Sequence, residues 1–220
     1  MPSLRLVLFG CFVLMLAVSG AGADNDRLTA AAAVLDEIMQ IPDKSIPLDL
    51  FTKASCVVIV PDLKKGAFVV GGKYGRGYFS CRKKQGGWSA PGAVRVEGGS
   101  VGFQIGATAS DLVMLVMNSR GVDRLLSNKF TVGVEGSVAA GPVGRDASAE
   151  TDATMRAEML AWSRSRGVFA GISLEGATLR EDHDENRLLY GRDLSNRTIV
   201  TGQTAAPLAA APLLAALKKY

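Results

Sequence analysis

The spacing of hydrophobic and polar positions predicts a chain built mostly from short β-strands, with one long helix near its start. Over residues 24–40, Leu28, Ala31 and Leu35 recur on one helical face, and Ile41-Pro42 ends the pattern. Apolar or β-branched runs then indicate strands at residues 56–60, 68–73, 77–83, 93–106, 112–117, 130–141, 157–165 and 167–174. Because parallel pairing needs longer crossover segments, the expected fold class is α+β, predominantly antiparallel β with an N-terminal helix and a few short helices.

Proline and glycine mark where these strands are expected to end or bend. Pro61 is expected to stop the strand at residues 56–60, because proline has no amide hydrogen for a strand ladder. The glycine cluster over residues 71–77 would permit a bend, or backbone conformations closed to other residues. The remaining patterns indicate short helices at residues 48–53, 122–127 and 193–197, and they leave residues 186–190 ambiguous.

Both ends of the chain are expected to lie outside the folded domain. Residues 1–23 combine Arg5, an apolar run and the small-residue site Ala21-Gly-Ala23, which predicts a secretory signal peptide rather than a span of roughly 20 residues. Acylation of Cys11 is left open. Residues 24–202 would form a single domain. The Ala-, Pro- and Leu-rich residues 203–220 are expected to be a flexible tail, with a small amphipathic helix after Pro212 as the alternative.

Cysteine and histidine are too few to build a metal centre. Once the signal peptide is removed, Cys56 and Cys81 can form one disulfide in an oxidising compartment, or they can pack as two small buried thiols. These two cysteines and the single His183 cannot supply the four ligands of a structural zinc site. Residues 181–185 are acidic but lack the spacing of a calcium loop, which favours a solvated acidic turn. We therefore expect no metal and no cofactor.

Charge is distributed unevenly along the chain, although the formal net charge is only +4. Residues 53–95 contain nine basic side chains and one acid, whereas residues 146–186 contain nine acids and four arginines. A basic stretch is often just a solvated face, but each Lys or Arg near an anionic membrane contributes on the order of 1 kcal/mol. Nucleic acid is not an expected partner, because the chain is predicted to be exported and carries no recognised nucleic-acid motif.

The candidate lipid-binding residues follow from this basic stretch. Trp88 lies close to three of the cations and can either pack in the core or stand at a membrane interface. The residues expected to contact an anionic phospholipid surface are Lys64, Lys65, Lys73, Arg76, Arg82, Lys83, Lys84 and Trp88.

One short motif raises the alternative of a serine hydrolase. Gly98-Gly-Ser-Val-Gly102 matches the G-x-S-x-G nucleophile elbow, and Asp111 or Asp123 and then His183 follow Ser100 in the required order. The elbow needs a helix after the serine, whereas the residues after Gly102 continue a strand pattern. A phosphate loop at residues 66–73 fails as well, because Tyr74 replaces the Ser or Thr that would hold magnesium. We expect no enzyme activity.

An ordered series of short blocks resembles the SYLF family of lipid-binding domains. The blocks are Val60-Pro61, residues 70–77, 88–91, 102–106, 111–113, 140–144, 162–171 and 173–176, and Asn186 with Tyr190-Gly191. The resemblance covers about residues 24–197. It implies a non-enzymatic domain that binds phospholipids, with membrane contact from an amphipathic N-terminal helix, and it implies actin regulation in fungal and animal members.

The predicted export is similar to that of the bacterial members of this family, so actin and phosphoinositides are not the expected ligands. The N-terminal helix contains the acids Asp36 and Glu37, which disfavour its insertion into an anionic membrane. The membrane contact is therefore expected from residues 64–95 instead. The sequence therefore predicts a periplasmic or extracellular, peripherally membrane-associated protein that binds anionic phospholipid. The alternative is an envelope-associated scaffold for protein partners.

Overall fold

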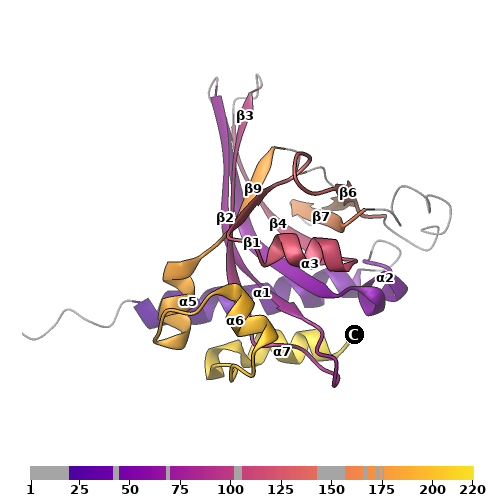
Figure 1. Ribbon diagram of the computed structural model, residues 1–220. Helices are drawn as coiled ribbons and strands as arrows, with labels where there is room; N and C mark the ends of the chain where they lie inside the picture. The colour runs from indigo at the N-terminus through magenta and orange to yellow at the C-terminus, as the bar shows by residue number, and fades with distance from the viewer. Residues whose placement is uncertain are drawn as a thin grey trace, which may run out of the picture.

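A single curved β-sheet organises the molecule (Figure 1). The computed structural model describes residues 20–41, 45–67, 70–101, 106–142, 157–165, 168–171, 174 and 176–220. The strands within these residues are β1 (Cys56–Ala67), β2 (Val70–Cys81), β3 (Gly92–Val101), β4 (Gly106–Val116), β5 (Lys129–Thr131), β6 (Val138–Ala140), β7 (Met159–Ser165), β8 (Val168–Gly171) and β9 (Ala177–Glu181). Their order is β5-β9-β3-β2-β1-β4-β7-β6, with β8 also paired to β7. Every pair except β6 with β7 is antiparallel, which confirms the predicted fold class.

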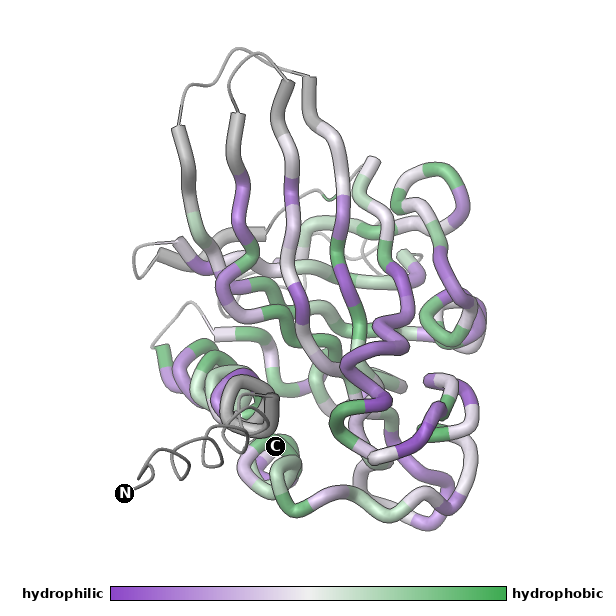
Figure 2. Tube along the Cα trace, turned by 90° about the vertical axis from the view of Figure 1, so that its left-hand side faces the viewer, coloured by the Kyte–Doolittle hydropathy of each residue, from purple (hydrophilic) through white to green (hydrophobic). Residues whose placement is uncertain are grey.

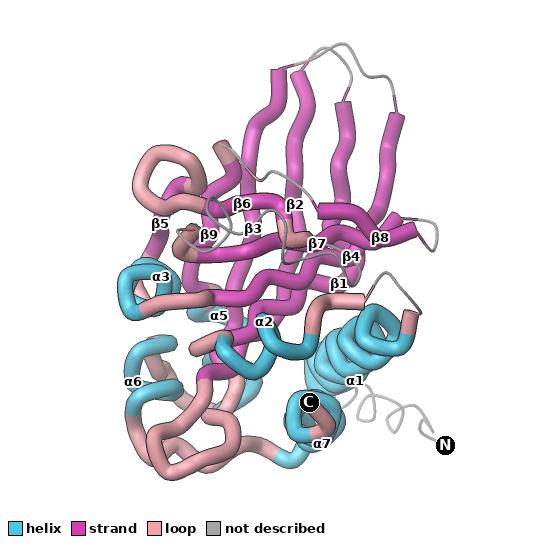
Figure 3. Tube along the Cα trace, turned by 90° about the vertical axis from the view of Figure 1, so that its right-hand side faces the viewer, coloured by secondary structure: helices cyan, strands magenta, loops and turns pink. Residues whose placement is uncertain are grey.

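Helices cover both faces of the sheet. They are α1 (Gly20–Gln40), α2 (Leu48–Lys53), α3 (Ser119–Leu125), α5 (His183–Tyr190), α6 (Asn196–Thr201) and α7 (Ala211–Lys218), with a 3-10 turn, η1 (Leu208–Ala210), before α7. The side chains of α1, α2 and α7 enter one hydrophobic core, and those of α3 and α6 enter the other. Figure 3 shows α1 and α7 running together on one side of the sheet.

The two cores explain the continuous apolar run at the start of β1. Val57 and Ile59 are buried in the core beneath α1, whereas Val58 and Val60 are buried in the core beneath α3 and α6. Successive side chains of a strand point to opposite faces, so a strand covered on both faces needs apolar residues at every position.

Pro61 does not end this strand, contrary to the sequence expectation. β1 continues to Ala67 through a β-bulge, seen as a shift of pairing register between Ile59 and Lys64. Within the bulge, Asp62 has a φ of 52° and its amide donates a hydrogen bond to Asp111 Oδ1 at 3.0 Å. A bulge frees the backbone locally from the ladder, so the missing amide hydrogen of proline is tolerated there.

The glycines of β2 allow close packing rather than a bend. A Cβ atom on Gly77 would lie 2.1 Å from the carbonyl oxygen of Ile59, and one on Gly75 would lie 2.8 Å from the side chains of Leu63 and Val60. Neither glycine has a positive φ. β2 therefore runs as one strand from residue 70 to residue 81, where the sequence suggested two.

Four strands extend beyond the rest of the sheet. β9 pairs with β3 only at residues 94–98, and β7 pairs with β4 only at residues 111–116. The ends of β1, β2, β3 and β4 beyond these pairings rise away from the helices as a four-stranded projection (Figures 1 and 2). Glycine and alanine dominate its paired rows, as in the row of Gly66, Gly72, Gly99 and Ala107. The projection is thus thin, and its few long side chains stand out.

The end of the chain is folded, so the expectation of a flexible tail is wrong. Leu213, Ala216 and Leu217 of α7 are buried against α1. Lys219 Nζ donates a hydrogen bond to Asp36 Oδ2 at 2.6 Å. Pro212 lies in the first turn of α7, where the missing amide hydrogen costs nothing, so it does not interrupt the helix.

Other expectations are met in part. The short helix at residues 48–53 is confirmed as α2, and the N-terminal helix is confirmed, although α1 begins at Gly20. Residues 1–19 lie outside the described residues, so the signal peptide stays a prediction. The strand expected at residues 130–141 is divided into β5 and β6, and the ambiguous residues 186–190 belong to α5.

Candidate functional site

The five lysines predicted to bind lipid fall into two groups at opposite ends of β2; Lys65 and Lys73 are half-buried, and the other three are exposed. Lys64, Lys65 and Lys73 lie on the projection, whereas Lys83 and Lys84 lie in the turn that follows the other end of β2. Ten residues separate Lys73 from Lys83, and at about 3.3 Å per residue the two groups are roughly 30 Å apart. The lysines that the sequence suggested would share one basic surface therefore lie in two separate places.

On the projection, Lys65 and Lys73 face each other across the β1–β2 pair. They are direct partners in the pairing register, so their side chains leave the same face of the sheet. Partial burial and the charge of Lys73 lower the pKa of Lys65. Lys64 points to the other face, where it pairs with Asp62 at 3.8 Å. Two ammonium groups opposite each other repel, and an anion bound between them would relieve that repulsion.

Arg76 is not available as the sequence suggested, because it belongs to a buried ion network. Its Nε and Nη2 atoms donate to the two carboxylate oxygens of Asp182 at 2.6 and 2.9 Å. These hydrogen bonds raise the pKa of Arg76. Glu185 Oε2 lies 3.4 Å from Arg76 Nη1, and Glu185 Oε1 accepts hydrogen bonds from Arg27 of α1 and Tyr78 of β2. Arg76 thus joins α5 to the sheet instead of facing solvent.

The acidic residues 181–185 are part of the fold and not the solvated turn that their composition suggested. Glu181, Asp182 and Glu185 are all buried. Asp182 caps α5, because its side chain accepts a hydrogen bond from the amide of Glu185. An N-cap Asp followed three residues later by Glu is a helix-start signal, and it could have identified α5 from the sequence.

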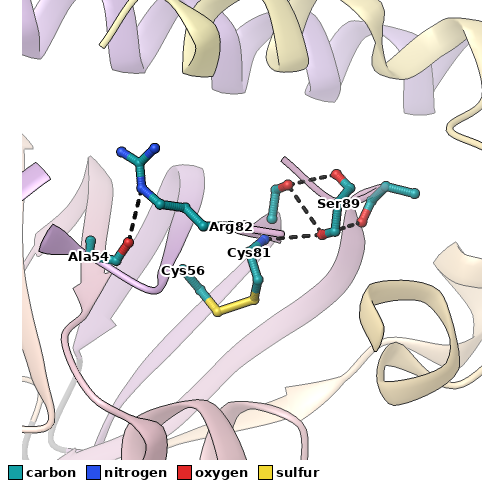
Figure 4. The surroundings of a disulfide bond; sticks show 7 residues. Ala54, Cys56, Cys81, Arg82 and Ser89 are labelled. Carbon is teal, nitrogen blue, oxygen red and sulfur yellow. Dashed lines mark hydrogen bonds between the residues drawn. A yellow bond between two sulfur atoms is a disulfide. The ribbon is translucent and has the colours of Figure 1, made fainter. Parts of the chain in front are cut away.

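The guanidinium group of Arg82 also makes its contacts within the protein. Its Nε atom donates to the carbonyl oxygen of Ala54 at 3.2 Å (Figure 4), and its Nη2 atom donates to that of Phe51, also at 3.2 Å, at the end of α2. Its guanidinium carbon lies 4.4 Å from the centre of the Trp88 ring. Arginine thereby satisfies carbonyl groups at a helix C-terminus and stacks on an aromatic face, two contacts suited to its planar cation.

The Trp88 side chain is packed in the hydrophobic core and is not at the surface. Its side chain is 6% exposed, and its Nε1 atom donates a hydrogen bond to the carbonyl oxygen of Leu217 at 2.9 Å. Phe51 packs against its ring at a centroid distance of 6.0 Å. Trp88 therefore attaches α7 to the turn after β2, and it is removed from the set of residues that can reach a membrane.

Cys56 and Cys81 form a disulfide, which settles the alternative left open by the sequence (Figure 4). They are direct partners in the register of β1 and β2, so the two sulfur atoms leave the same face. Both residues are buried. The bond joins β1 to β2 at the end farthest from the projection, beside Arg82.

Ser100 does not lie on a nucleophile elbow. It is within β3 and pairs with Gly71 of β2, and β4 begins only at Gly106. The arrangement is strand to strand, where the elbow requires strand to helix. In the part of the chain that the structure describes, no three metal-binding side chains gather into a cation site, and no helix has the length and apolar character needed to cross a bilayer.

An open pocket of about 410 Å³ lies between α3 and β5. Its lining carries Arg120, Arg124 and Lys129 but also Asp123 and Glu135, and Arg124 is in addition paired with Glu158 at 2.6 Å. Charges of both signs balance there, so the pocket offers no preference for an anion comparable to that of the facing lysines on the projection.

A family model described as "Ysc84: Las17-binding protein actin regulator" matches residues 97–220. An SH3 domain-containing protein of Schizosaccharomyces pombe is 41% identical over 172 residues, which are 76% of this chain and 40% of the relative. The human SH3 domain-containing YSC84-like protein 1 is 35% identical over 196 residues, 86% of this chain and 57% of the relative. Protein YSC84 of Saccharomyces cerevisiae is 36% identical over 180 residues, 80% of this chain and 38% of the relative. The chain thus spans between about two fifths and three fifths of the length of these relatives.

Proposed function

The chain belongs to the Ysc84, or SYLF, family, and from that premise we propose that it is an exported, non-enzymatic protein that binds anionic phospholipid headgroups through lysine side chains. The observation that carries the proposal is the facing pair Lys65 and Lys73 on the projection. Neither lysine has a carboxylate partner among the described residues, whereas Lys53, Lys64 and Lys219 each pair with an aspartate.

The facing pair suits a phosphate for electrostatic reasons. The depressed pKa of Lys65 reflects a charge that is partly desolvated and repelled by its neighbour. A headgroup phosphate placed between the two ammonium groups would stabilise both charges, at about 1 kcal/mol for each lysine. Glycine and alanine dominate the surrounding rows, so few long side chains stand between the lysines and a flat surface.

Export is part of the proposal and is supported from two sides. The sequence of residues 1–23 predicts a secretory signal peptide. The Cys56–Cys81 disulfide suits an oxidising compartment such as the periplasm or the exterior of the cell. The absence of enzyme activity is supported by the strand context of Ser100, by the description of the matching family model as an actin regulator, and by relatives named for SH3 domains.

The test is co-sedimentation of the purified protein with phosphatidylcholine vesicles that contain or lack phosphatidylglycerol, at low and high salt. The variant Lys65→Ser/Lys73→Ser removes the facing pair, and Lys53→Ser/Lys129→Ser removes the same charge from exposed positions elsewhere. We expect binding that requires phosphatidylglycerol, weakens with salt and falls at least about tenfold in the first variant only. Binding that ignores both salt and phosphatidylglycerol would contradict the proposal.

A second candidate function is a scaffold for protein partners. The matching family model is described as Las17-binding, and one Saccharomyces cerevisiae relative is named LAS seventeen-binding protein 3, so relatives of this chain are named for protein partners. Failure to bind vesicles of any composition would favour this function. Limited proteolysis of a captured complex would then map the part of the chain that the partner protects.

A further inference from the structure

The C-terminal segment has an unusual exposed face. Residues 205–217 include no polar or charged side chain. Leu213 and Leu217 are buried against α1, yet Leu208 is 94% exposed. The other exposed positions of the segment are Ala205, Ala206, Ala211, Pro212 and Ala215. A surface helix ordinarily carries polar residues on its outer side, and one that is apolar all round is typical of a helix with something covering it.

Three lysines that form no ion pair within the described residues lie at one end of this apolar face. Lys218 ends α7, and Lys83 and Lys84 lie in the turn after β2. The hydrogen bond from Trp88 to the Leu217 carbonyl holds that turn beside α7 (Figure 1). Within the described residues none of these three lysines forms an ion pair, while the neighbouring Lys219 is paired with Asp36.

We propose that these exposed apolar residues and the three lysines together form a second membrane-contacting surface, here called the C-terminal surface. The apolar side chains would lie at the boundary between headgroups and acyl chains. Lys83, Lys84 and Lys218 would extend to the phosphates. This inference rests on the proposed function for the class of ligand, and it adds a site at the opposite end of β2 from Lys65 and Lys73.

Charge complementarity favours an anionic bilayer over another occupant. The outward residues of the C-terminal segment include no acid, so an anionic surface meets only apolar groups and unpaired cations there. α1 cannot supply this contact in its place, because Leu28, Leu35 and Ile38 are fully buried in the core. Leu208 of the C-terminal segment is the most exposed large apolar side chain among the described residues.

The experiment introduces a charge into the apolar face and compares it with an equally exposed site elsewhere. Leu208→Asp alters the C-terminal surface, and Val134→Asp alters the turn between β5 and β6, where Val134 is 81% exposed. β5 and β6 lie on the opposite side of the molecule from α7 (Figure 3). We expect Leu208→Asp to weaken binding to phosphatidylglycerol-containing vesicles about tenfold, and most clearly at high salt, because apolar contact is not screened. Val134→Asp should bind like the unaltered protein.

A polarity-sensitive dye gives a readout independent of affinity. Attached to a Leu208→Cys variant, the dye should shift to shorter wavelength on mixing with the vesicles, and on a Val134→Cys variant it should not. Binding that persists without this shift and is indifferent to Leu208→Asp would overturn the inference and leave the proposed function standing. A dye shift that survives in a Lys65→Ser/Lys73→Ser background would support the C-terminal surface separately. Conversion of a dimer to a monomer by Leu208→Asp without vesicles would identify a second copy as the occupant and overturn the inference.

Discussion

At the scale of single residues, the use of a basic side chain depends on what lies opposite it. Arg76 lies in the middle of β2 and Arg82 directly follows its end, and both donate to groups of the protein. The half-buried Lys65 and Lys73 lie opposite each other, and neither has a carboxylate partner within the described residues. The planar guanidinium suits paired acceptors such as a carboxylate or two carbonyls, and the ammonium group is a compact charge that is readily left in solvent. In this basic stretch, Arg76 and Arg82 thus stabilise the fold, and the lysines are the candidate lipid-binding residues.

Whether a glycine of β2 can be replaced also depends on the atoms that lie opposite it. In Gly77→Ala the new Cβ atom would meet the Ile59 carbonyl oxygen at 2.1 Å, so we expect the free energy of unfolding to fall by about 1–3 kcal/mol or more. Urea denaturation measures the change. The control is Gly72→Ala in the same strand, where the nearest atom to a Cβ is 4.0 Å away. Equal stability of the two variants would contradict the close packing of Gly77 against the backbone of β1.

At the scale of elements, buried ions determine how the helices attach to the sheet. Glu185 of α5 accepts from Arg27 of α1 and from Tyr78 of β2, and Asp182 accepts from Arg76. The strands themselves could be predicted, because β-branched runs and turns are local properties of the sequence. The ion network could not, because it brings together residues more than a hundred positions apart, and acidic composition alone indicates solvent exposure.

The importance of the network is tested by removing one buried charge. Glu185→Gln leaves Arg27 and Arg76 without their shared partner, so we expect a loss of roughly 3 kcal/mol of stability, reduced to the extent that both arginines can still reach water. Thermal unfolding followed by circular dichroism measures it. Asp184→Asn on the same helix serves as the control, since the Asp184 side chain is 73% exposed and should change stability by less than about 1 kcal/mol.

At the scale of the whole molecule, the candidate surfaces occupy two ends that β2 connects. The ordered blocks of sequence were enough to identify the family and the antiparallel architecture. The division of the lysines into two groups was not predictable, because it required knowing that residues 70–81 form one uninterrupted strand. The docked C-terminal segment was missed because its composition suggests disorder, and the apolar residues that it packs against belong to α1, more than 170 residues earlier.

The disulfide gives the last prediction, which concerns the stability of the whole fold. The Cys56–Cys81 bond spans 25 residues of sequence and encloses the β1–β2 hairpin, including the two strands that it contributes to the projection. Closing a loop of this length restricts the unfolded chain and stabilises the folded state by about 3 kcal/mol in the chain-entropy model. We expect Cys56→Ala/Cys81→Ala to lower the free energy of unfolding by about that amount, as measured by urea denaturation.

Reductant supplies the control for this variant. It should destabilise the unaltered protein to a similar extent once the bond is reduced, and it should leave the double variant unchanged. If reductant and substitution both had no effect on stability, the bond would contribute nothing to the fold. A clear loss would mean that the central hairpin, which connects the facing lysines to the C-terminal surface, depends for its full stability on oxidation. The folded protein would then be best maintained in the oxidising compartment to which its N-terminal sequence is proposed to direct it.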